Sequence, residues 1–145
     1  MIDAYLDWHH LNIRWGAGGY IFRKYFSGFM DKDGNWSTPE AVQESWILIH
    51  KSLKLIQKMW LNGSSTYLFG EEPTIADLSL ACELIQLQAI DFPLKEKYAR
   101  IHKYVYDDMM KIEAFRHFNE EGGLKVKLLI KAIDKKRQKE KDAKL

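Results

Sequence analysis

Apolar residues recur along this chain at the three- and four-residue spacing of amphipathic helices, not at the alternating spacing of strands. The patterns predict helices at residues 2–30, 39–60, 74–87, 94–110, 113–118 and from 124 onward. The helix after Thr74 is apolar on more than one face, which is typical of a helix at the centre of a bundle. We therefore predict an all-α bundle of five or six helices.

Glycine, proline and turn-forming residues predict where these helices break. Residues 31–35 read as a loop, and Thr38 followed by Pro39 predicts a helix start. Pro93 and the pair Gly122–Gly123 predict further breaks. The three glycines within 16–19 predict a kink or a close approach of another helix.

The sharpest local signal is Thr74-Ile-Ala-Asp77. A hydroxyl at the helix start and a carboxylate three residues later can each accept a backbone N–H hydrogen bond, which makes a capping box with Asp in place of the usual Glu. We therefore interpret Thr74 and Asp77 as structural residues, and we expect no catalytic role for Asp77.

Composition places the chain among single globular domains. Its 145 residues are 46% hydrophobic and 29% charged. Nine basic and three acidic residues give residues 125–145 a charge of +6, which leaves −4 for the rest of a chain with net charge +2. We expect a helical domain at 1–136 and a charged, frayed tail at 137–145. Aromatic residues are not interleaved with the tail bases, so a solvated helix end is favoured over a nucleic-acid site.

The cysteine and histidine content bears on compartment and chemistry. The one cysteine, Cys82, excludes a disulfide framework and fits a reducing compartment such as the cytoplasm. Its apolar neighbours predict a buried, inert thiol. His9 and His10 are adjacent, so they point about 100° apart on a helix, and a packing role is favoured over metal binding. No apolar run approaches the ~20 residues of a membrane span.

Two segments carry a resemblance to a known family. The first is Leu6-Asp-Trp-His-His-Leu-Asn-Ile-Arg14 with Trp15-Gly-Ala-Gly-Gly-Tyr20, and the second is Thr74-Ile-Ala-Asp-Leu-Ser-Leu80 with the helix that follows. In this order and at this spacing they resemble the C-terminal domain of theta-class, plant-like glutathione transferases, over about residues 2–136. The capping box alone is common to many helices, whereas the Trp-His-His string is more distinctive.

The resemblance implies a function and also an expected gap. The family joins the glutathione thiolate to electrophilic carbon, with glutathione as co-substrate and no other cofactor. A thioredoxin-like domain binds and activates glutathione, and the helical domain shapes the electrophile pocket. The sequence carries no thioredoxin-like segment, so we expect this chain alone to be inactive. Three alternatives stay open: a piece of a transferase, a non-catalytic scaffold or assembly subunit, and a small-molecule carrier.

The resemblance also implies candidate site residues, but no catalytic residue and no metal ligand. Arg14 is expected to face the cleft and bind anionic substrate groups, or else to form an ordinary ion pair within the bundle. Leu11, Asn12 and Ile13 complete a stretch that contributes to glutathione binding in some members, and Leu11 stands where those members often have Asp. Trp8 and Phe22, with Trp15 and Tyr20, are pocket candidates, although aromatic residues at this spacing are more often core or interface.

A partner is expected from the same helix. Five large aromatic residues within residues 8–25 are more than one side of a helix buries comfortably. They are Trp8, Trp15, Tyr20, Phe22 and Tyr25. We expect them to border an open apolar face, covered in a homodimer or a larger assembly. The rival interpretation is that these side chains turn inward and polar groups close the surface.

Overall fold

The computed structural model describes residues 1–30 and 36–143, so the predicted loop at 31–35 lies outside the described part. The helices are α1 (Ile2–Leu11), α2 (Ile13–Ile21), α3 (Ser27–Met30), α4 (Pro39–Met59), α5 (Ile75–Gln86), α6 (Leu94–Lys97), α7 (Ala99–Lys103) and α8 (Glu113–Asp142). π-Helical segments at 22–26 and 104–108 and 3-10 turns at 87–90 and 109–111 extend them. The described residues form no strand, which confirms the all-α class.

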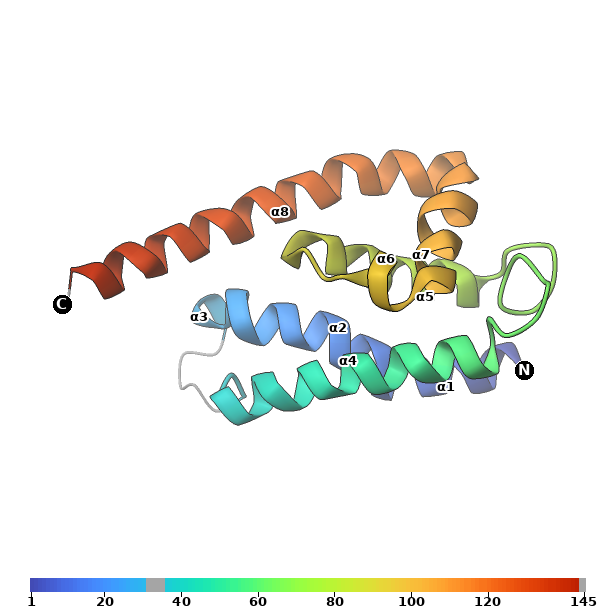
Figure 1. Ribbon diagram of the computed structural model, residues 1–145, viewed down its shortest axis with the longest axis horizontal. Coiled ribbons are helices and arrows are strands. Elements are labelled where there is room, and N and C mark those ends of the chain that lie inside the picture. The colour runs from blue at the N-terminus through green and yellow to red at the C-terminus, as the bar shows by residue number, and fades with distance from the viewer. Residues whose placement is uncertain (31–35, 144–145) are drawn as a thin grey trace.

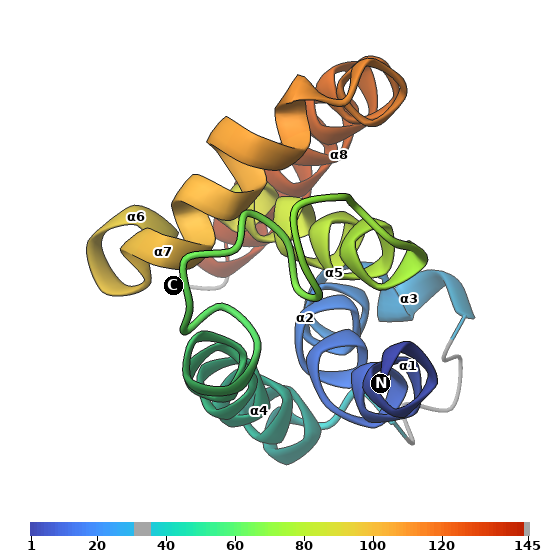
Figure 2. The same cartoon turned by 90° about the vertical axis from the view of Figure 1, so that its right-hand side faces the viewer.

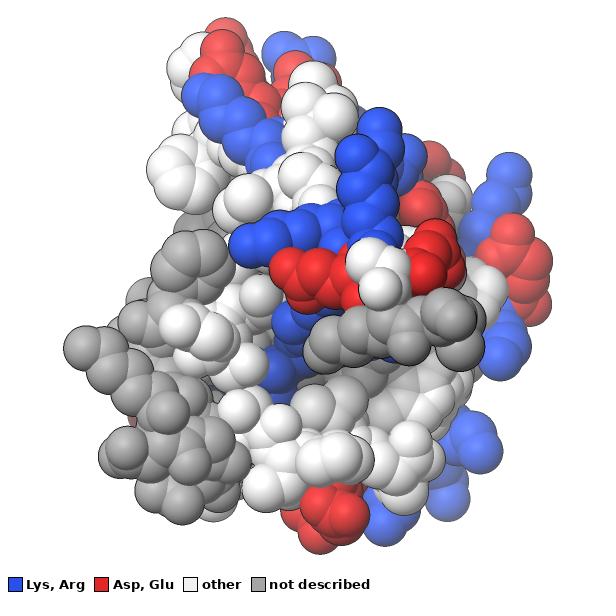
Figure 3. Space-filling view, turned by 90° about the vertical axis from the view of Figure 1, so that its left-hand side faces the viewer, with Lys and Arg blue, Asp and Glu red and all other residues white. Residues whose placement is uncertain are grey.

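The helices form a bundle around α5. The interrupted helix α1–α3 runs antiparallel to α4, α5 lies between this pair and α8, and the C-terminal part of α8 extends past the other helices (Figures 1 and 2). Figure 3 shows the end of the molecule that lies on the left in Figure 1. Basic side chains gather over α8 at this end and are mixed with acidic ones. No helix in the described part is long and apolar enough to cross a membrane.

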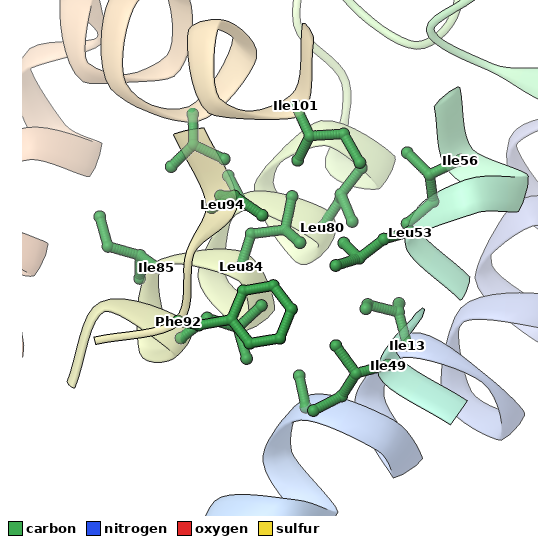
Figure 4. Close-up of a cluster of buried hydrophobic side chains, with 14 of the residues drawn as sticks. Ile13, Ile49, Leu53, Ile56, Leu80, Leu84, Ile85, Phe92, Leu94 and Ile101 are labelled. Atoms are coloured by element: carbon green, nitrogen blue, oxygen red, sulfur yellow. The ribbon is translucent and has the colours of Figure 1, made fainter. Parts of the chain in front are cut away.

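Helix α5 supplies the centre of the hydrophobic core, as its sequence predicted. Leu80 and Leu84 are fully buried and point toward Leu53 of α4 (Figure 4). Ile13 of α2 and Ile101 of α7 complete the cluster from the two sides. Burying such aliphatic side chains contributes roughly 2 kcal/mol each, so this region of the fold resists opening.

Glycine brings α2 against α4. A Cβ atom built on Gly16 would lie 2.9 Å from the backbone nitrogen of Ile49, so only glycine permits this contact without a shift of one helix. The close approach expected from the glycines is thus confirmed. The change in chain direction lies at Asn12 instead, where φ is −120° and ψ is −89°.

Both predicted helix starts are formed. Thr38 caps α4 by accepting a 3.2 Å hydrogen bond from the Ala41 N–H. At the start of α5, the Asp77 carboxylate accepts the Thr74 N–H at 2.8 Å and the Thr74 hydroxyl accepts the Ala76 N–H at 3.2 Å. The capping box is therefore confirmed, and it fixes where the central helix begins.

Three expected boundaries were wrong. The pair Gly122–Gly123 does not break the chain, because α8 continues through it from Glu113 to Asp142. Two glycines cost about 2 kcal/mol in a helix, and buried Phe115 and Ile130 on either side hold the helix against the bundle. Residues 137–142 are likewise helical, not frayed.

The third boundary lies in the helix expected at 94–110. That segment is split between α6 and α7, with the break at Tyr98, where φ is −140° and ψ is 56°. The buried Tyr98 ring reaches α4, and its hydroxyl lies 2.8 Å from His50 Nδ1. This anchoring favours the non-helical backbone at Tyr98.

Candidate functional site

Two pockets adjoin on the side of the bundle where α2 and its π-helical extension meet α5. The first, of about 400 Å³, lies between these elements and α8. Its lining is mostly apolar and includes Ile21, Phe22, Phe26, Ile85, Ala89 and Val126. The second, of about 360 Å³, lies toward the start of α2. Its lining includes Arg14, Trp15, Arg23, Trp36 and Glu83.

We name these the apolar pocket and the arginine pocket. Gly18, Phe22 and Gln86 line both, so the two cavities share a wall. A ligand with an apolar body and a polar head could therefore occupy both at once. This combination of an apolar cavity with a few convergent polar groups is the usual form of a small-molecule site.

Arg14 lies at a pocket and also forms an ion pair, so its position is compatible with both interpretations that the sequence left open. It lines the arginine pocket, and its Nε atom lies 3.7 Å from Glu83 Oε1. The Arg14 side chain remains 60% exposed. An ion pair this long and this accessible to water is weak, so an anionic ligand can compete with Glu83 for the guanidinium.

Glu83 is the site residue that the sequence analysis missed. Its side chain is only 9% exposed, and its carboxylate also accepts a 3.1 Å hydrogen bond from Gln86 Nε2. Burial raises the pKa of Glu83, and the opposing effects of Arg14 and Gln86 do not cancel that rise. The signal in the sequence was an acidic residue within an otherwise apolar run, between Ala81 and Leu84.

His9 lies behind Glu83 in the core. The ring is 1% exposed, with Nε2 3.9 Å from Glu83 Oε1 and Nδ1 3.4 Å from the Tyr5 hydroxyl. Burial, with smaller effects from His10 and Arg14, lowers the pKa of His9 to about 4. The contact with Glu83 is therefore not an ion pair near neutral pH, and the expected packing role of His9 is confirmed.

The stretch from Leu11 to Arg14 does not form one continuous surface. Leu11 is 77% exposed, whereas Ile13 is fully buried and lines neither pocket. Asn12 uses its Nδ2 atom to donate a 2.8 Å hydrogen bond to the Trp8 carbonyl, which supports the break between α1 and α2. Within this stretch, Arg14 is the residue that lines a described pocket.

The five aromatic residues of α1, α2 and the π-helical segment mostly point into the bundle. Tyr20 and Tyr25 are buried, and Trp8 packs against Trp60 with ring centroids 4.6 Å apart. Phe22 stacks on Trp36 and lines both pockets, while Trp15 stays 58% exposed. The expectation that all five border an open face was wrong, because Trp46 of α4 packs against Tyr20, Arg137 of α8 lies over Tyr25, and Trp60 and Trp36 pack against Trp8 and Phe22.

Cys82 also differs from expectation. The residue is exposed and lines the apolar pocket, because Leu80, Ala81 and Leu84 take the inward positions of α5. Partial desolvation by its neighbours, with a smaller effect from Glu83, raises the pKa of the thiol. The thiol is therefore accessible but is mostly protonated at neutral pH.

Comparison with known proteins gives one family. The family model for the C-terminal domain of glutathione S-transferase matches residues 39–105. Glutathione S-transferase T1 of Arabidopsis thaliana is 38% identical over 122 residues, covering 82% of this chain and 49% of that protein. Glutathione S-transferase T2 of the same plant is 39% identical over 105 residues, covering 72% of this chain and 17% of that protein.

A more distant relative is glutathione S-transferase theta-1 of Gallus gallus, 28% identical over 103 residues, which cover 71% of this chain and 38% of that protein. The chain thus spans about half or less of the length of the curated relatives that it matches. No solved structure matches it significantly. These matches indicate the same family as the helical bundle and the capping box at Thr74. The chain belongs to the glutathione S-transferases and carries a C-terminal domain of the theta class.

Proposed function

We propose that this bundle is the electrophile-binding half of a glutathione transferase. The observation that carries the proposal is the apolar pocket joined to the arginine pocket through Phe22, in a chain whose relatives are named glutathione S-transferases. In the reaction, the glutathione sulfur forms a bond to an electrophilic carbon, and the leaving group departs with the bonding electrons.

The residues of this chain would bind and orient the electrophile. The apolar body would lie against Phe26, Ile85 and Val126, where burial of apolar surface provides affinity. Arg14, once released from Glu83, would bind a negatively charged substituent or stabilise a departing anion. Glutathione is the co-substrate, and the groups that ionise its thiol are expected on a thioredoxin-like domain.

Product binding tests this proposal directly. The dinitrophenyl conjugate of glutathione is titrated into the 145-residue chain, with quenching of tryptophan fluorescence as the signal. We expect saturable binding that weakens about tenfold or more in Phe22→Ala, since that change removes part of both pocket walls. Leu128→Ala, at an exposed position of α8 outside both pockets, is the matched control. Circular dichroism establishes that each variant is folded.

Two outcomes would contradict the proposal. Absence of saturable binding would favour the scaffold or assembly role over a binding role. Equal affinity in Phe22→Ala and wild type would place the ligand elsewhere. In a separate assay with glutathione and chlorodinitrobenzene, we expect no turnover from this chain alone, and turnover that disappears in Arg14→Ala would show that the bundle itself activates the thiol.

Homodimerisation is part of the proposal and has its own surface. Ile47, Leu55 and Met59 form an exposed apolar row on α4 at four- and eight-residue spacing. We expect light scattering to give a dimer mass at micromolar concentration, and Leu55→Glu to shift it to the monomer. A wild-type monomer would remove the dimer from the proposal without affecting the ligand site.

A further inference from the structure

Helix α8 turns one long side away from the bundle. On its inner side, Ile130 is 2% exposed, and Val126 and Ile133 pack against the core. The residues on the opposite side are all exposed, and α8 lies along the outside of the molecule (Figures 1 and 2). We name this side the outer face of α8. Its residues are Leu124, Lys125, Leu128, Leu129, Lys131, Ala132, Lys135, Lys136 and Lys139.

Leucine and lysine share the outer face in two adjacent rows. Because side chains three and four residues apart are neighbours on a helix, each row follows one side of α8. One row is Leu124, Leu128, Lys131, Lys135 and Lys139, and the other is Lys125, Leu129, Ala132 and Lys136. Leu124 is 60% exposed, Leu128 59% and Leu129 48%. Contact of these leucines with an apolar medium would remove their surface from water, which is favourable.

Much of the positive charge of α8 is not neutralised within the chain. Eight basic and three acidic residues give residues 125–143 a charge of +5, and Figure 3 shows basic side chains gathered over this helix. Lys135 and Lys139 take part in no ion pair among the described residues. Two exposed ion pairs neutralise part of the charge, and each is weak in water. They are Lys125–Glu121 and Lys136–Glu140. The complement of the outer face is therefore an anionic surface.

We propose that the outer face of α8 binds the surface of a lipid bilayer that carries acidic headgroups. The helix lies in the plane of the interface, with its three exposed leucines at the boundary of the acyl chains. The lysines of the same face extend their apolar stems beside the leucines and place their ammonium groups among the headgroups. This binding is peripheral and reversible. It is independent of the electrophile site, because no residue of the outer face lines the apolar pocket or the arginine pocket.

The composition and shape of the outer face favour a bilayer over other anionic partners. No aromatic residue follows Phe118 in the chain, so the face offers no ring on which a nucleic-acid base could stack. Three exposed leucines gain nothing from a phosphate backbone, whereas they are buried against acyl chains. One side of a single helix is convex and provides no groove, although a groove is what a helical peptide partner usually occupies.

Co-sedimentation of the full chain with vesicles tests this surface. Phosphatidylcholine vesicles are used with and without about 30% phosphatidylserine. In about 0.1 M salt we expect binding to the acidic vesicles and little binding to phosphatidylcholine alone, and in about 1 M salt we expect the binding to be lost through screening.

Charge reversal locates the contact. Lys135→Glu combined with Lys139→Glu should lower partitioning onto acidic vesicles about tenfold or more, because two attractive charges become repulsive. Lys54→Glu combined with Lys58→Glu is the matched control, with the same charge change at the same spacing on exposed positions of α4. This control should stay within about twofold of wild type, since its charges lie away from the outer face.

A leucine variant separates a bilayer from other anionic partners. Leu124→Gln combined with Leu128→Gln keeps the charge and the helix but removes apolar contact, so it should weaken vesicle binding about fivefold or more. Circular dichroism establishes that each variant is folded. Unchanged vesicle affinity in this variant would show that charge alone is recognised, which contradicts a bilayer contact.

Three other outcomes would also overturn the proposal. The first is a wild-type chain that does not sediment with the acidic vesicles. The second is an equal loss of binding in the α4 control, which would reduce the effect to net charge. The third is tighter binding to duplex DNA than to the acidic vesicles, unaffected by the leucine changes, which would assign the outer face to a nucleic acid.

Discussion

Helix α5 buries two carboxylates only six residues apart, and their surroundings differ sharply. Asp77 is fully buried and accepts hydrogen bonds from Thr74 N–H, Thr74 Oγ1 and Leu68 N–H at 2.8 Å and from the Tyr104 hydroxyl at 3.0 Å. Glu83 accepts one hydrogen bond, from Gln86; its ionic contact with Arg14 is 3.7 Å long, and the uncharged His9 ring lies 3.9 Å away.

The difference between Asp77 and Glu83 indicates how a buried carboxylate that supports the fold can be distinguished from one that borders a ligand site. Every lone pair direction of Asp77 is occupied by groups from the loop before α5 and from the segment after α7, so a ligand has nothing to replace. Glu83 stands at a pocket wall with long contacts that a ligand can exchange. A buried charge with incomplete partners at a cavity is the better indicator of a site.

The largest effect should come from breaking the Asp77 network. We expect Asp77→Ala to lower the free energy of unfolding by about 3–5 kcal/mol, because it leaves several buried donors without acceptors. Urea denaturation followed by circular dichroism measures this. Leu78→Ala, an exposed change on the same turn, is the control and should cost under about 1 kcal/mol. An Asp77→Ala variant as stable as this control would show that the network contributes little.

A smaller, pH-dependent effect should come from His9. Because the folded protein lowers its pKa from 6.5 to about 4, folding favours the neutral ring. The resulting stability is full above pH 6.5 and is lost as the pH falls toward 4, by up to about 3 kcal/mol.

The measurement is the difference in unfolding free energy between wild type and His9→Gln across this range. That difference should shift against wild type as the pH falls. The same difference for Leu78→Ala, an exposed change that removes no titratable group, should stay flat. A flat profile for His9→Gln as well would mean that the His9 ring is protonated or hydrated in the folded state.

Glu83→Gln should have a smaller effect on stability than Asp77→Ala, and it should strengthen the binding of an anionic ligand. The pKa of Glu83 is raised, so its contribution to stability is full below about pH 4.5 and is lost as the pH rises through the folded-state value. Glutamine resembles the protonated acid, and we expect the variant to be within about 1 kcal/mol of wild type at pH 7, or more stable.

Removal of the negative charge also frees Arg14, so the affinity of Glu83→Gln for anilinonaphthalene sulfonate should rise a few fold at low salt, roughly the worth of a weak ion pair. Urea denaturation and probe titration check the two parts. Destabilisation comparable to Asp77→Ala would abolish the contrast between the two carboxylates.

The smallest expected effect concerns the thiol beside Glu83. Cys82 lines the apolar pocket and has a raised pKa, so iodoacetamide should modify it slowly at pH 7 and faster as the pH rises. Saturating phenylnaphthylamine should slow the modification a few fold by covering the thiol. Mass spectrometry follows the reaction. An unchanged rate would indicate that the probe binds away from the apolar pocket.

Local interactions explain what could be predicted for the fold. The Thr74–Asp77 box, the Thr38 cap and the apolar spacing of α4 and α5 each depend on residues within one or two turns, so the sequence alone reveals them. Family membership followed from such strings as well. The break at Tyr98 depends instead on a distant contact with His50, and local spacing carries no sign of it.

The candidate site was predictable only in part. The sequence by itself determined an all-helical chain, a capped central helix and the placing of Arg14 and Phe22 as pocket candidates. Only the tertiary structure decided that Ile13 enters the core, that Cys82 faces the pocket, and that α8 continues through two glycines. It also brought Glu83 and Arg23 to the same cavity from different helices. The physical reason is that helix formation is governed by neighbours in sequence, whereas burial and charge compensation depend on groups that meet only when the helices pack.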